Sequence, residues 1–335
     1  MGAGLTRDAG FAASHAGKLT ENRKVTDHFR LFAIRPFTRI IRCSHVTTEV
    51  GPLATSFPDQ ATLESVLDVA ARAPSSRNLQ PWRWRVDGAA VHLYADWHRQ
   101  AGGSPTDRRD VLLGCGAVLD HCAVAFAAAG WSPRVRRFPD GGDKFPGTDS
   151  GRLAILEVVE QPPNAANLEL AAAIPRRRAD LRRYPAQPIP PATVELLVIR
   201  AARLGVELAV VPRSRWVRHE DGRVALRFSD DEGEPDDDAV LLVLGTREDN
   251  DAMRLRAGEA LSHITLTATA MGLATCPLTE PLNDMLSRLE LACEVFDGEA
   301  HPQALIRLGL PPTDDVPEPM TERRSVDETT EWTRR

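Results

Sequence analysis

Two segments of the chain place apolar residues at the spacing of an amphipathic helix. They read "TLESVLDVAAR" at 62–72 and "TVELLVIRAAR" at 193–203, and the leading threonine of each predicts a side-chain N-cap. Two longer segments are rich in small apolar residues, "GAVLDHCAVAFAAAG" at 116–130 and "GEALSHITLTATAMG" at 258–272. Their composition is typical of helices that are buried on all sides, so we expect two long core helices.

Short apolar runs predict four strands. They read "AVHLYAD", "LAILEV", "AVLLVLG" and "ALIRLG", at residues 90–96, 153–158, 239–245 and 304–309. The predicted elements follow the order helix, strand, long helix, strand, and this order occurs twice. The sequence therefore predicts a protein built from two similar halves.

The two long helices also share residues at identical internal spacing. Gly116 and His121 of the first correspond to Gly258 and His263 of the second. We interpret the chain as an internal duplication whose halves form a pseudo-dimer, so that a monomer supplies the interface two separate chains would otherwise build. For the two histidines we expect packing or interface roles.

Changes in composition mark the ends of the two halves. Residues 1–58 lack clear periodicity and are interpreted as a flexible extension or an overlong start. The first half is assigned to 59–160 and the second to 165–312, because a Pro-Pro-Asn sequence at 162–164 interrupts the pattern. The polar segment 313–335 is assigned no fold of its own.

Composition excludes several classes of protein. The chain has 335 residues, 42% of them hydrophobic, which can supply a sizeable core. A net charge of −6 argues against nucleic acid or an anionic membrane as a partner, and no run of 18 apolar residues predicts a membrane helix. Five cysteines without a Cys-x-x-Cys pair favour neither a metal site nor a disulfide framework, and the amino terminus lacks a secretory signal pattern. We expect a cytoplasmic protein.

The stretch "APSSRNLQPW" at 73–82 is the first candidate for chemistry. Hydroxyl and amide side chains lie between two prolines that fix the backbone, and they can donate and accept hydrogen bonds along the edge of a flat heterocycle. These residues are Ser75, Ser76, Asn78 and Gln80, between Pro74 and Pro81. The alternative is an ordinary loop whose polar side chains satisfy the local backbone.

An arginine-rich segment opens the second half. Five arginines crowd into eight residues, which indicates an anion site built from guanidinium groups, with a solvated basic face as the alternative. They are Arg176, Arg177, Arg178, Arg182 and Arg183. A further arginine, Arg307, lies within an apolar strand, where a buried or half-buried anion is a reasonable partner. The first half has Glu157 at the equivalent place and no arginine in its opening.

The sequence resembles the nitroreductase-like flavoproteins, and within them the fused, Acg-type oxidoreductases. The family's Pro-Ser-Ser-x-Asn-x-Gln-Pro-Trp loop, which lies against flavin mononucleotide (FMN), is matched at 74–82, including Trp82. The family's phosphate-binding opening, Arg-x-Ser-x-Arg/Lys-x-Phe, is matched by Arg178, Arg182 and Tyr184, with Asp180 in place of the serine. The basic residue of the terminal strand is matched by Arg307.

The resemblance covers roughly residues 60–312 and implies a nitroreductase-like α+β fold with one FMN per chain. The implied ring contacts are Pro74, Ser75, Ser76, Asn78 and Gln80, walled by Trp82, and the implied phosphate contacts are Arg178, Arg182 and Arg307. NAD(P)H would reduce the flavin, and a small acceptor such as a quinone or nitroaromatic would reoxidise it, with no catalytic side chain required. The alternative is a protein that stores flavin without turnover, with the acidic segment 228–238 closing over the ring.

Overall fold

A computed structural model describes residues 57–100, 102, 105–141, 151–227, 238–313 and 321–333. Residues 1–56, most of the expected amino-terminal extension, lie outside this description. So do residues 228–237, which hold nearly all of the acidic segment expected to cover the ring.

The first half forms a five-stranded sheet. Its strands, in spatial order, are β11 (Thr330–Trp332), β1 (Trp82–Val86), β2 (Val91–Ala95), β4 (Arg152–Glu160) and β3 (Trp131–Arg137). Strands β1, β2, β4 and β3 pair antiparallel, whereas β11 joins the edge of the sheet parallel to β1. The final strand of the chain therefore belongs to the sheet of the first half.

The second half forms a four-stranded antiparallel sheet and a small hairpin. The sheet holds β5 (Glu207–Val210), β8 (Val240–Thr246), β10 (His301–Gly309) and β9 (Ala274–Leu278) in this spatial order, and the hairpin pairs β6 (Trp216–Arg218) with β7 (Val224–Leu226). The order β5-β8-β10-β9 repeats the order β1-β2-β4-β3 of the first half. The prediction of an α+β fold with two similar halves is confirmed.

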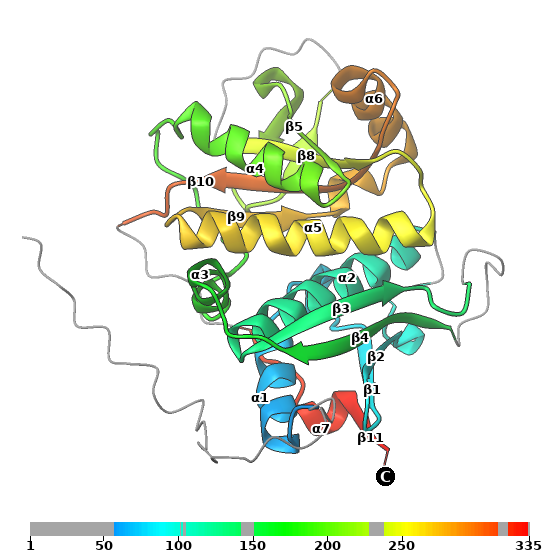
Figure 1. Ribbon diagram of the computed structural model, residues 1–335. Helices are drawn as coiled ribbons and strands as arrows, with labels where there is room; N and C mark the ends of the chain where they lie inside the picture. Colours follow the sequence, from blue (N-terminus) through cyan, green and yellow to red (C-terminus); the bar gives the residue numbers. More distant parts are fainter. Residues whose placement is uncertain are drawn as a thin grey trace, which may run out of the picture. The chain divides into compact units, whose positions relative to one another are not determined.

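Two long helices lie side by side between the sheets, α2 (Pro105–Ala128) and α5 (Asp251–Ala270), and each covers the sheet of its own half (Figure 1). Helix α1 (Gln60–Ala70) packs on α2, and α4 (Pro191–Arg203) packs on β5 and α5. The remaining helices are α3 (Ala165–Ala173), α6 (Met285–Phe296) and the short α7 (Val326–Thr329). The helices predicted from the sequence are present, but α2 and α5 begin earlier than the small-residue runs that predicted them.

The threonine N-caps predicted for α1 and α4 are wrong. Asp59 caps α1 and accepts a hydrogen bond from the Thr62 amide, so Thr62 lies inside the first turn. Helix α4 starts after Pro190 without a side-chain cap and has proline at its first position. Proline suits that position because its missing N–H would have no partner inside the helix.

The crossing of α2 and α5 depends on two glycines at matching positions. A Cβ on Gly116 would collide with backbone atoms of Leu255 and Glu259, and a Cβ on Gly258 would collide with the backbone of Leu113. The helix backbones therefore approach more closely than side chains would allow. This approach brings together core residues of both halves, since Leu255 belongs to the core of the first half and Leu113 to that of the second.

Polar residues also join the two long helices. His121 Nδ1 lies 2.7 Å from Ser262 Oγ, which donates to Asp120 Oδ2 at 2.5 Å, and His263 Nδ1 lies 3.3 Å from Asp120 Oδ1. The two equivalent histidines thus lie at the interface between the halves, as expected.

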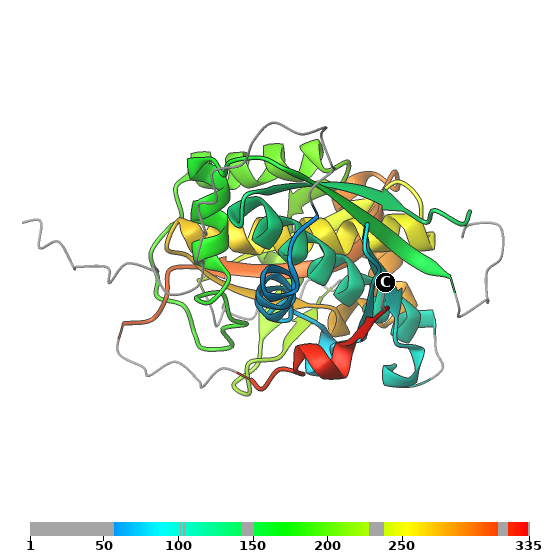
Figure 2. The same cartoon turned by 60° about the horizontal axis from the view of Figure 1, so that its bottom comes forward.

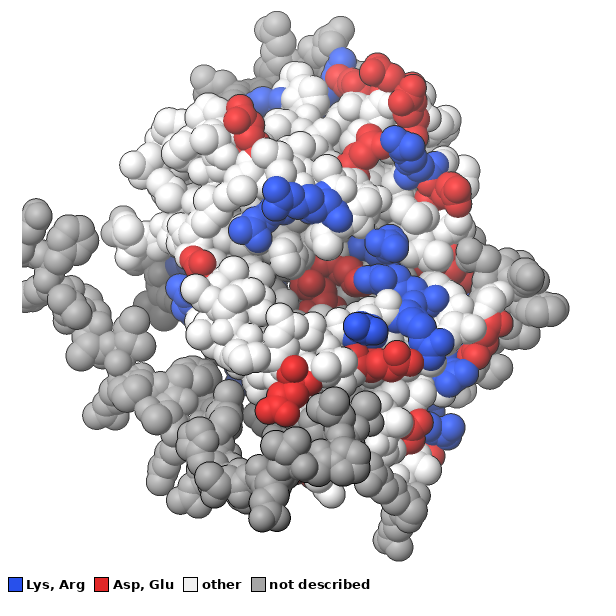
Figure 3. All heavy atoms as spheres, in the orientation of Figure 1, with Lys and Arg blue, Asp and Glu red and all other residues white. Residues whose placement is uncertain are grey.

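Ion pairs cross the same interface at its edges. Arg137 of β3 binds Glu259 of α5 at 2.6 Å, and Arg108 of α2 binds Asp251 of α5 at 3.1 Å. The face seen in Figure 3 accordingly shows basic and acidic side chains next to one another around the hollow between the halves. Pairing across the interface fixes the relative position of the two sheets.

Helix α2 is long and apolar enough over Thr106–Ala128 to cross a membrane, yet 83% of its most apolar window is buried inside the protein. A buried core helix passes the same test of length and composition. Both cysteines of this helix, Cys115 and Cys122, are fully buried and belong to the core of the first half.

The carboxyl-terminal segment, defined here as residues 321–333, returns to the first half, where α7 lies beside α1 and β1 (Figure 2). Ser325 and Glu328 form a capping box at the start of α7. Arg324 donates to the Gln80 and Trp82 carbonyls at 3.2 and 3.4 Å. The sequence pattern assigned this segment no fold, because its order comes from contacts with residues 242–246 positions away rather than from its own periodicity.

Burial holds the pKa of His121 well below its ordinary value, and the nearby Arg177 lowers it further. The unfolded histidine takes up a proton near pH 6.5, whereas the folded one stays neutral, so the free energy of unfolding should fall as the pH drops below about 6.5. The slope contributed by His121 is at most about 1.4 kcal/mol per pH unit. Urea unfolding at pH 7 and pH 5 measures it. His121→Gln should flatten the slope, while His98→Gln, at an exposed position, should keep it; an unchanged slope in His121→Gln would contradict the assignment.

Candidate functional site

A cavity of about 450 Å³ lies where the two halves meet. The first half contributes the loop after α1 and part of α2, and the second contributes residues 177–182, part of β9, and the short helix η5 (Glu280–Leu282) with the residues before it. Thr321 and Arg323 of the carboxyl-terminal segment complete the wall. The volume lies in the range of small-molecule sites, which is roughly 300–1,000 Å³.

The first-half wall is a tight turn with unusual backbone angles. The single helical turn η1 (Ser76–Asn78) follows α1, and Arg77, Asn78 and Gln80 have φ values of 47°, 55° and 50°. Residues other than glycine and asparagine rarely adopt positive φ values. Such backbone strain concentrates at binding and active sites. Ser75 Oγ accepts a hydrogen bond from the Gln80 amide at 2.9 Å and closes the turn.

The turn rests directly on α2 because Gly114 faces it. A Cβ at Gly114 would lie 3.1 Å from Pro81 Cγ and 3.2 Å from Ser75 Cβ, so a larger residue would push the turn away. The Cys115 thiol also donates to the Pro81 carbonyl at 3.1 Å. The helix and the turn therefore form one continuous wall.

The two amide side chains of the turn bind the carboxyl-terminal segment. Asn78 Nδ2 donates to the Glu322 carbonyl at 2.9 Å, and Asn78 Oδ1 accepts from Arg323 Nη1 at 2.8 Å. Gln80 Oε1 accepts from the Arg324 amide at 2.8 Å, and Gln80 is 5% exposed. Asn78 still lines the cavity, whereas Gln80 lies behind it.

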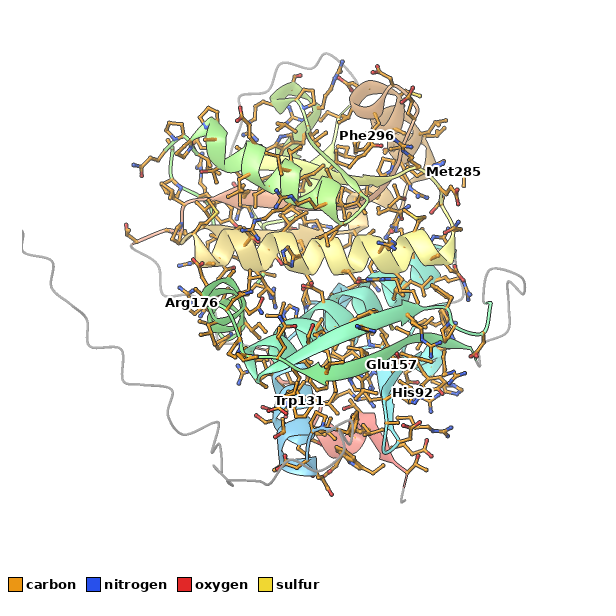
Figure 4. The ribbon with its side chains drawn as sticks, viewed as in Figure 1. His92, Trp131, Glu157, Arg176, Met285 and Phe296 are labelled. Carbon is orange, nitrogen blue, oxygen red and sulfur yellow. The ribbon has the colours of Figure 1, made fainter. Side chains whose placement is uncertain are left out.

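The second-half wall is the arginine-rich segment. Arg177, Arg178 and Arg182 line the cavity, but Asp180 binds Arg182 in two contacts of 2.9 and 2.6 Å. Although burial opposes it, hydrogen bonds from Arg182 hold the pKa of Asp180 below its ordinary value, so Asp180 is ionised and offsets the charge of Arg182. Exposed Arg176, labelled in Figure 4, lines a separate cavity of about 340 Å³ instead.

Arg307 lies beneath this segment rather than in the cavity. It is fully buried on β10, donates to the Asp180 and Arg182 carbonyls at 3.3 and 2.7 Å, and stacks on Tyr184 with 4.1 Å from its guanidinium carbon to the ring centre. Arg307 therefore binds backbone carbonyls and an aromatic ring, and its charge also attracts the Asp180 carboxylate of the same segment. Its equivalent, Glu157, is half-exposed on β4 and pairs with Arg136 at 3.0 Å (Figure 4).

Six of the nine residues predicted for the site line one cavity: Pro74, Ser75, Ser76, Asn78, Arg178 and Arg182. The structure places the other three outside it, namely Gln80, Trp82 and Arg307. Trp82 is fully buried in the core of the first half because its side chain points to the helix-covered face of β1. The expectation that Trp82 walls the pocket does not hold in this structure.

Three arginines that line the cavity have no role predicted from the sequence: Arg77, Arg177 and Arg323. Arg77 lies within the polar turn, Arg177 belongs to the arginine-rich segment, and Arg323 lies in the carboxyl-terminal segment. Arg177 is 3% exposed, yet its Nε and Nη1 have no hydrogen-bond partner among the described residues. Burial lowers the pKa of Arg177 to about 10, and the charge of Arg323 lowers it further. The cavity thus has a buried, strongly cationic part.

The remaining wall is less polar and holds one thiol. Leu113, Leu261 and Leu278 line the cavity, as does Cys276. Burial raises the pKa of Cys276 to about 12, so this thiol stays protonated at neutral pH. Among the residues that the structure describes, no cluster of three histidine, cysteine or acidic side chains could hold a metal ion.

This arrangement of sheets and helices is found in a solved nitroreductase structure. A "putative nitroreductase" from Anabaena variabilis superposes with a TM-score of 0.52 over 77% of this chain and 90% of its own, at 11% identity. A nitroreductase with bound FMN from Bacteroides fragilis matches 46% of this chain and 95% of its own, with a TM-score of 0.33 and 17% identity. The first of these comparisons defines the nitroreductase fold.

Sequence comparison gives the family. No family model matches the chain. "Putative NAD(P)H nitroreductase Rv3131" of Mycobacterium tuberculosis is 38% identical over 84% of this chain and 95% of its own length. "Putative NAD(P)H nitroreductase acg" of the same organism is 31% identical over 79% of this chain and 94% of its own. The chain therefore belongs to the nitroreductase family, in the group that includes Acg.

Proposed function

We propose that this protein is an oxidoreductase that binds FMN in the 450 Å³ cavity and passes electrons from NAD(P)H to a small acceptor such as a quinone or nitroaromatic. The observation that carries the proposal is Arg177, a buried cation in the cavity wall with two donor nitrogens lacking partners among the described residues. Arg177 Nη2 donates to the Arg72 carbonyl at 3.2 Å, but a neutral carbonyl does not balance the charge. A buried charge without a counter-charge is costly, so this position favours an anionic ligand.

A phosphate group fits this part of the cavity. Arg323 lines the same cavity and its Nε also has no hydrogen-bond partner among the described residues, while Asn78 and Thr321 hold its Nη1 in place. Burial lowers the pKa of Arg323, and the charge of Arg72 acts in the same direction. Guanidinium groups match phosphate oxygens in charge and geometry. We assign the phosphate to Arg177 and Arg323, with Arg178 beside them.

The other two predicted arginines, Arg182 and Arg307, support the site without binding the phosphate. Arg182 is neutralised by Asp180, and Arg307 holds the carbonyls of the 180–182 backbone. The ring of the cofactor would lie against Pro74, Ser75, Ser76 and Asn78, with the apolar residues of α2, α5 and β9 around it. Bound FMN would supply the two-electron chemistry, and the protein would hold and orient it.

The absorbance spectrum and an anaerobic titration test this function. We expect flavin bands at one FMN per chain, because the second half has "LGVELAVV" where the first has its polar turn, and the first half has no arginine-rich opening. NADH or NADPH should bleach the bands within seconds. Bound FMN that NADH and NADPH do not reduce would indicate a storage protein, and two FMN per chain would contradict the single composite site.

A further inference from the structure

One buried carboxyl in the cavity wall has no role in cofactor binding. Asp110 lies on α2, its side chain is 13% exposed, and it lines the cavity. Asp110 Oδ2 accepts a hydrogen bond from Thr279 Oγ1 of the second half at 3.3 Å, and the Ser76 side chain of the first half is a second donor to this carboxyl. Asp110 Oδ1 is buried without a hydrogen-bond partner among the described residues.

The neighbouring arginine does not neutralise Asp110. Arg109 Nε is 4.0 Å from Asp110 Oδ1, at the limit of an ion pair. The Arg109 guanidinium instead donates to the Leu282 carbonyl at 3.1 Å and to Asn283 Oδ1 at 2.8 Å. A carboxylate that is buried without a full counter-charge favours its neutral, protonated form.

The surroundings of Asp110 act on its pKa in both directions. Burial raises the pKa of Asp110, and Glu280 of η5 adds to the increase. The hydrogen bonds from Ser76 and Thr279 and the attraction of Arg109 act in the opposite direction, but burial outweighs them. The Cys276 thiol of β9 is neutral, since its pKa is raised to about 12. The remaining charged groups of the wall are Arg77, Arg177, Arg178, Asp180, Arg182 and Arg323. The pKa of Asp110 is raised in this setting, so the carboxyl keeps its proton to a higher pH than a surface aspartate.

The internal duplication indicates that the fold does not require an acid here. Gly116 corresponds to Gly258, an offset of 142 residues. With the same offset, Asp110 of α2 corresponds to Ala252 of α5. The acid is therefore present only in the half whose turn lines the composite cavity.

We propose that Asp110 is a catalytic acid that protonates the acceptor during its reduction. This inference rests on the proposed function. For a quinone acceptor, a C–H bond of NAD(P)H breaks and supplies two electrons and one hydrogen, which ends in the first O–H bond of the product; bound FMN would carry these electrons. The Asp110 O–H bond breaks and its proton forms the second O–H bond, at the other quinone oxygen, which gives the hydroquinone. The Asp110 carboxylate left behind takes a proton from solvent water.

The experiment measures only the oxidation of the cofactor by the acceptor, because the cofactor is reduced beforehand. FMN-loaded protein is reduced with dithionite and mixed with benzoquinone from pH 5 to pH 8 in a stopped-flow instrument. As the pH rises through the Asp110 pKa, we expect the rate of flavin oxidation in the wild type to fall in proportion to the fraction of Asp110 that is still protonated. In Asp110→Asn the rate at low pH should drop about 100-fold and lose this dependence, with FMN affinity unchanged. The control, Asp68→Asn on the exposed face of α1, should match the wild type.

A second measurement needs neither cofactor nor turnover. In protein labelled with ¹³C-aspartate, one carboxyl should titrate above the ordinary value of about 3.9 and disappear in Asp110→Asn or Asp110→Glu. The proposal is overturned if Asp110→Asn keeps the wild-type pH profile, or if the carboxyl signal lost in these variants titrates at the ordinary value. Failure of NAD(P)H to bleach the wild type would count against the proposed function alone, because dithionite supplies the electrons here.

Discussion

Replacing Gly258 with alanine is expected to lower the free energy of unfolding by about 3 kcal/mol, at the upper end of the usual range for overpacking. The added Cβ would collide with the Leu113 carbonyl and approach the Cα of Gly116. These are backbone atoms, so the strain cannot be relieved by rotating a side chain, and α2 and α5 must move apart. Because Leu113, Gly114 and Leu261 line the cavity, FMN affinity should fall together with stability.

Urea unfolding followed by circular dichroism measures the loss of stability, and fluorescence titration measures FMN affinity. Gly116→Ala should behave in the same way, because its Cβ would collide with the Leu255 carbonyl. The control is Gly151→Ala, where a Cβ has no described atom within 4 Å, and its stability should change by less than about 0.5 kcal/mol. Wild-type stability in Gly258→Ala would mean that the helices do not cross at these glycines.

Replacing Arg177 with methionine is expected to weaken FMN binding by roughly tenfold to a hundredfold for each charge-assisted hydrogen bond lost, at about 1.5–3 kcal/mol each. Riboflavin, which has no phosphate, should bind nearly as well as to the wild type. The cofactor-free variant should also be more stable than the wild type, because the substitution removes a buried charge that has no carboxylate partner among the described residues. A gain in stability combined with a loss of FMN affinity is the signature of a binding cation.

Calorimetric titration with FMN and with riboflavin tests this assignment. Arg176→Met is the matched control, since Arg176 is the adjacent arginine but is exposed and lines the separate cavity. It should leave both affinities nearly unchanged. Equal weakening of FMN and riboflavin in Arg177→Met would mean that Arg177 has a structural role and that the phosphate binds elsewhere.

Local sequence patterns determined the architecture of each half. Apolar runs located the strands at 90–96 and 304–309 within a few residues of β2 and β10, because strands whose residues are mostly buried need mostly apolar side chains. The repeat of Gly116 at Gly258 indicated the duplication, because only glycine allows these helices to touch backbone to backbone. The turn at 74–78 was also visible, since proline and strained polar residues follow α1 directly in sequence.

Only the tertiary structure decided which side chains share the cavity. Arg323 reaches Asn78 across 245 positions, and no local pattern encodes a contact at that separation. Arg177 differs from Arg176 and Arg178 in burial alone, which depends on how the segment lies between the halves. Trp82 and Arg307 fit a binding motif by spacing, but packing directs one into the core and the other beneath a backbone loop. Sequence specifies the elements through local periodicity, whereas the direction of a side chain is set by the neighbours that folding brings to it.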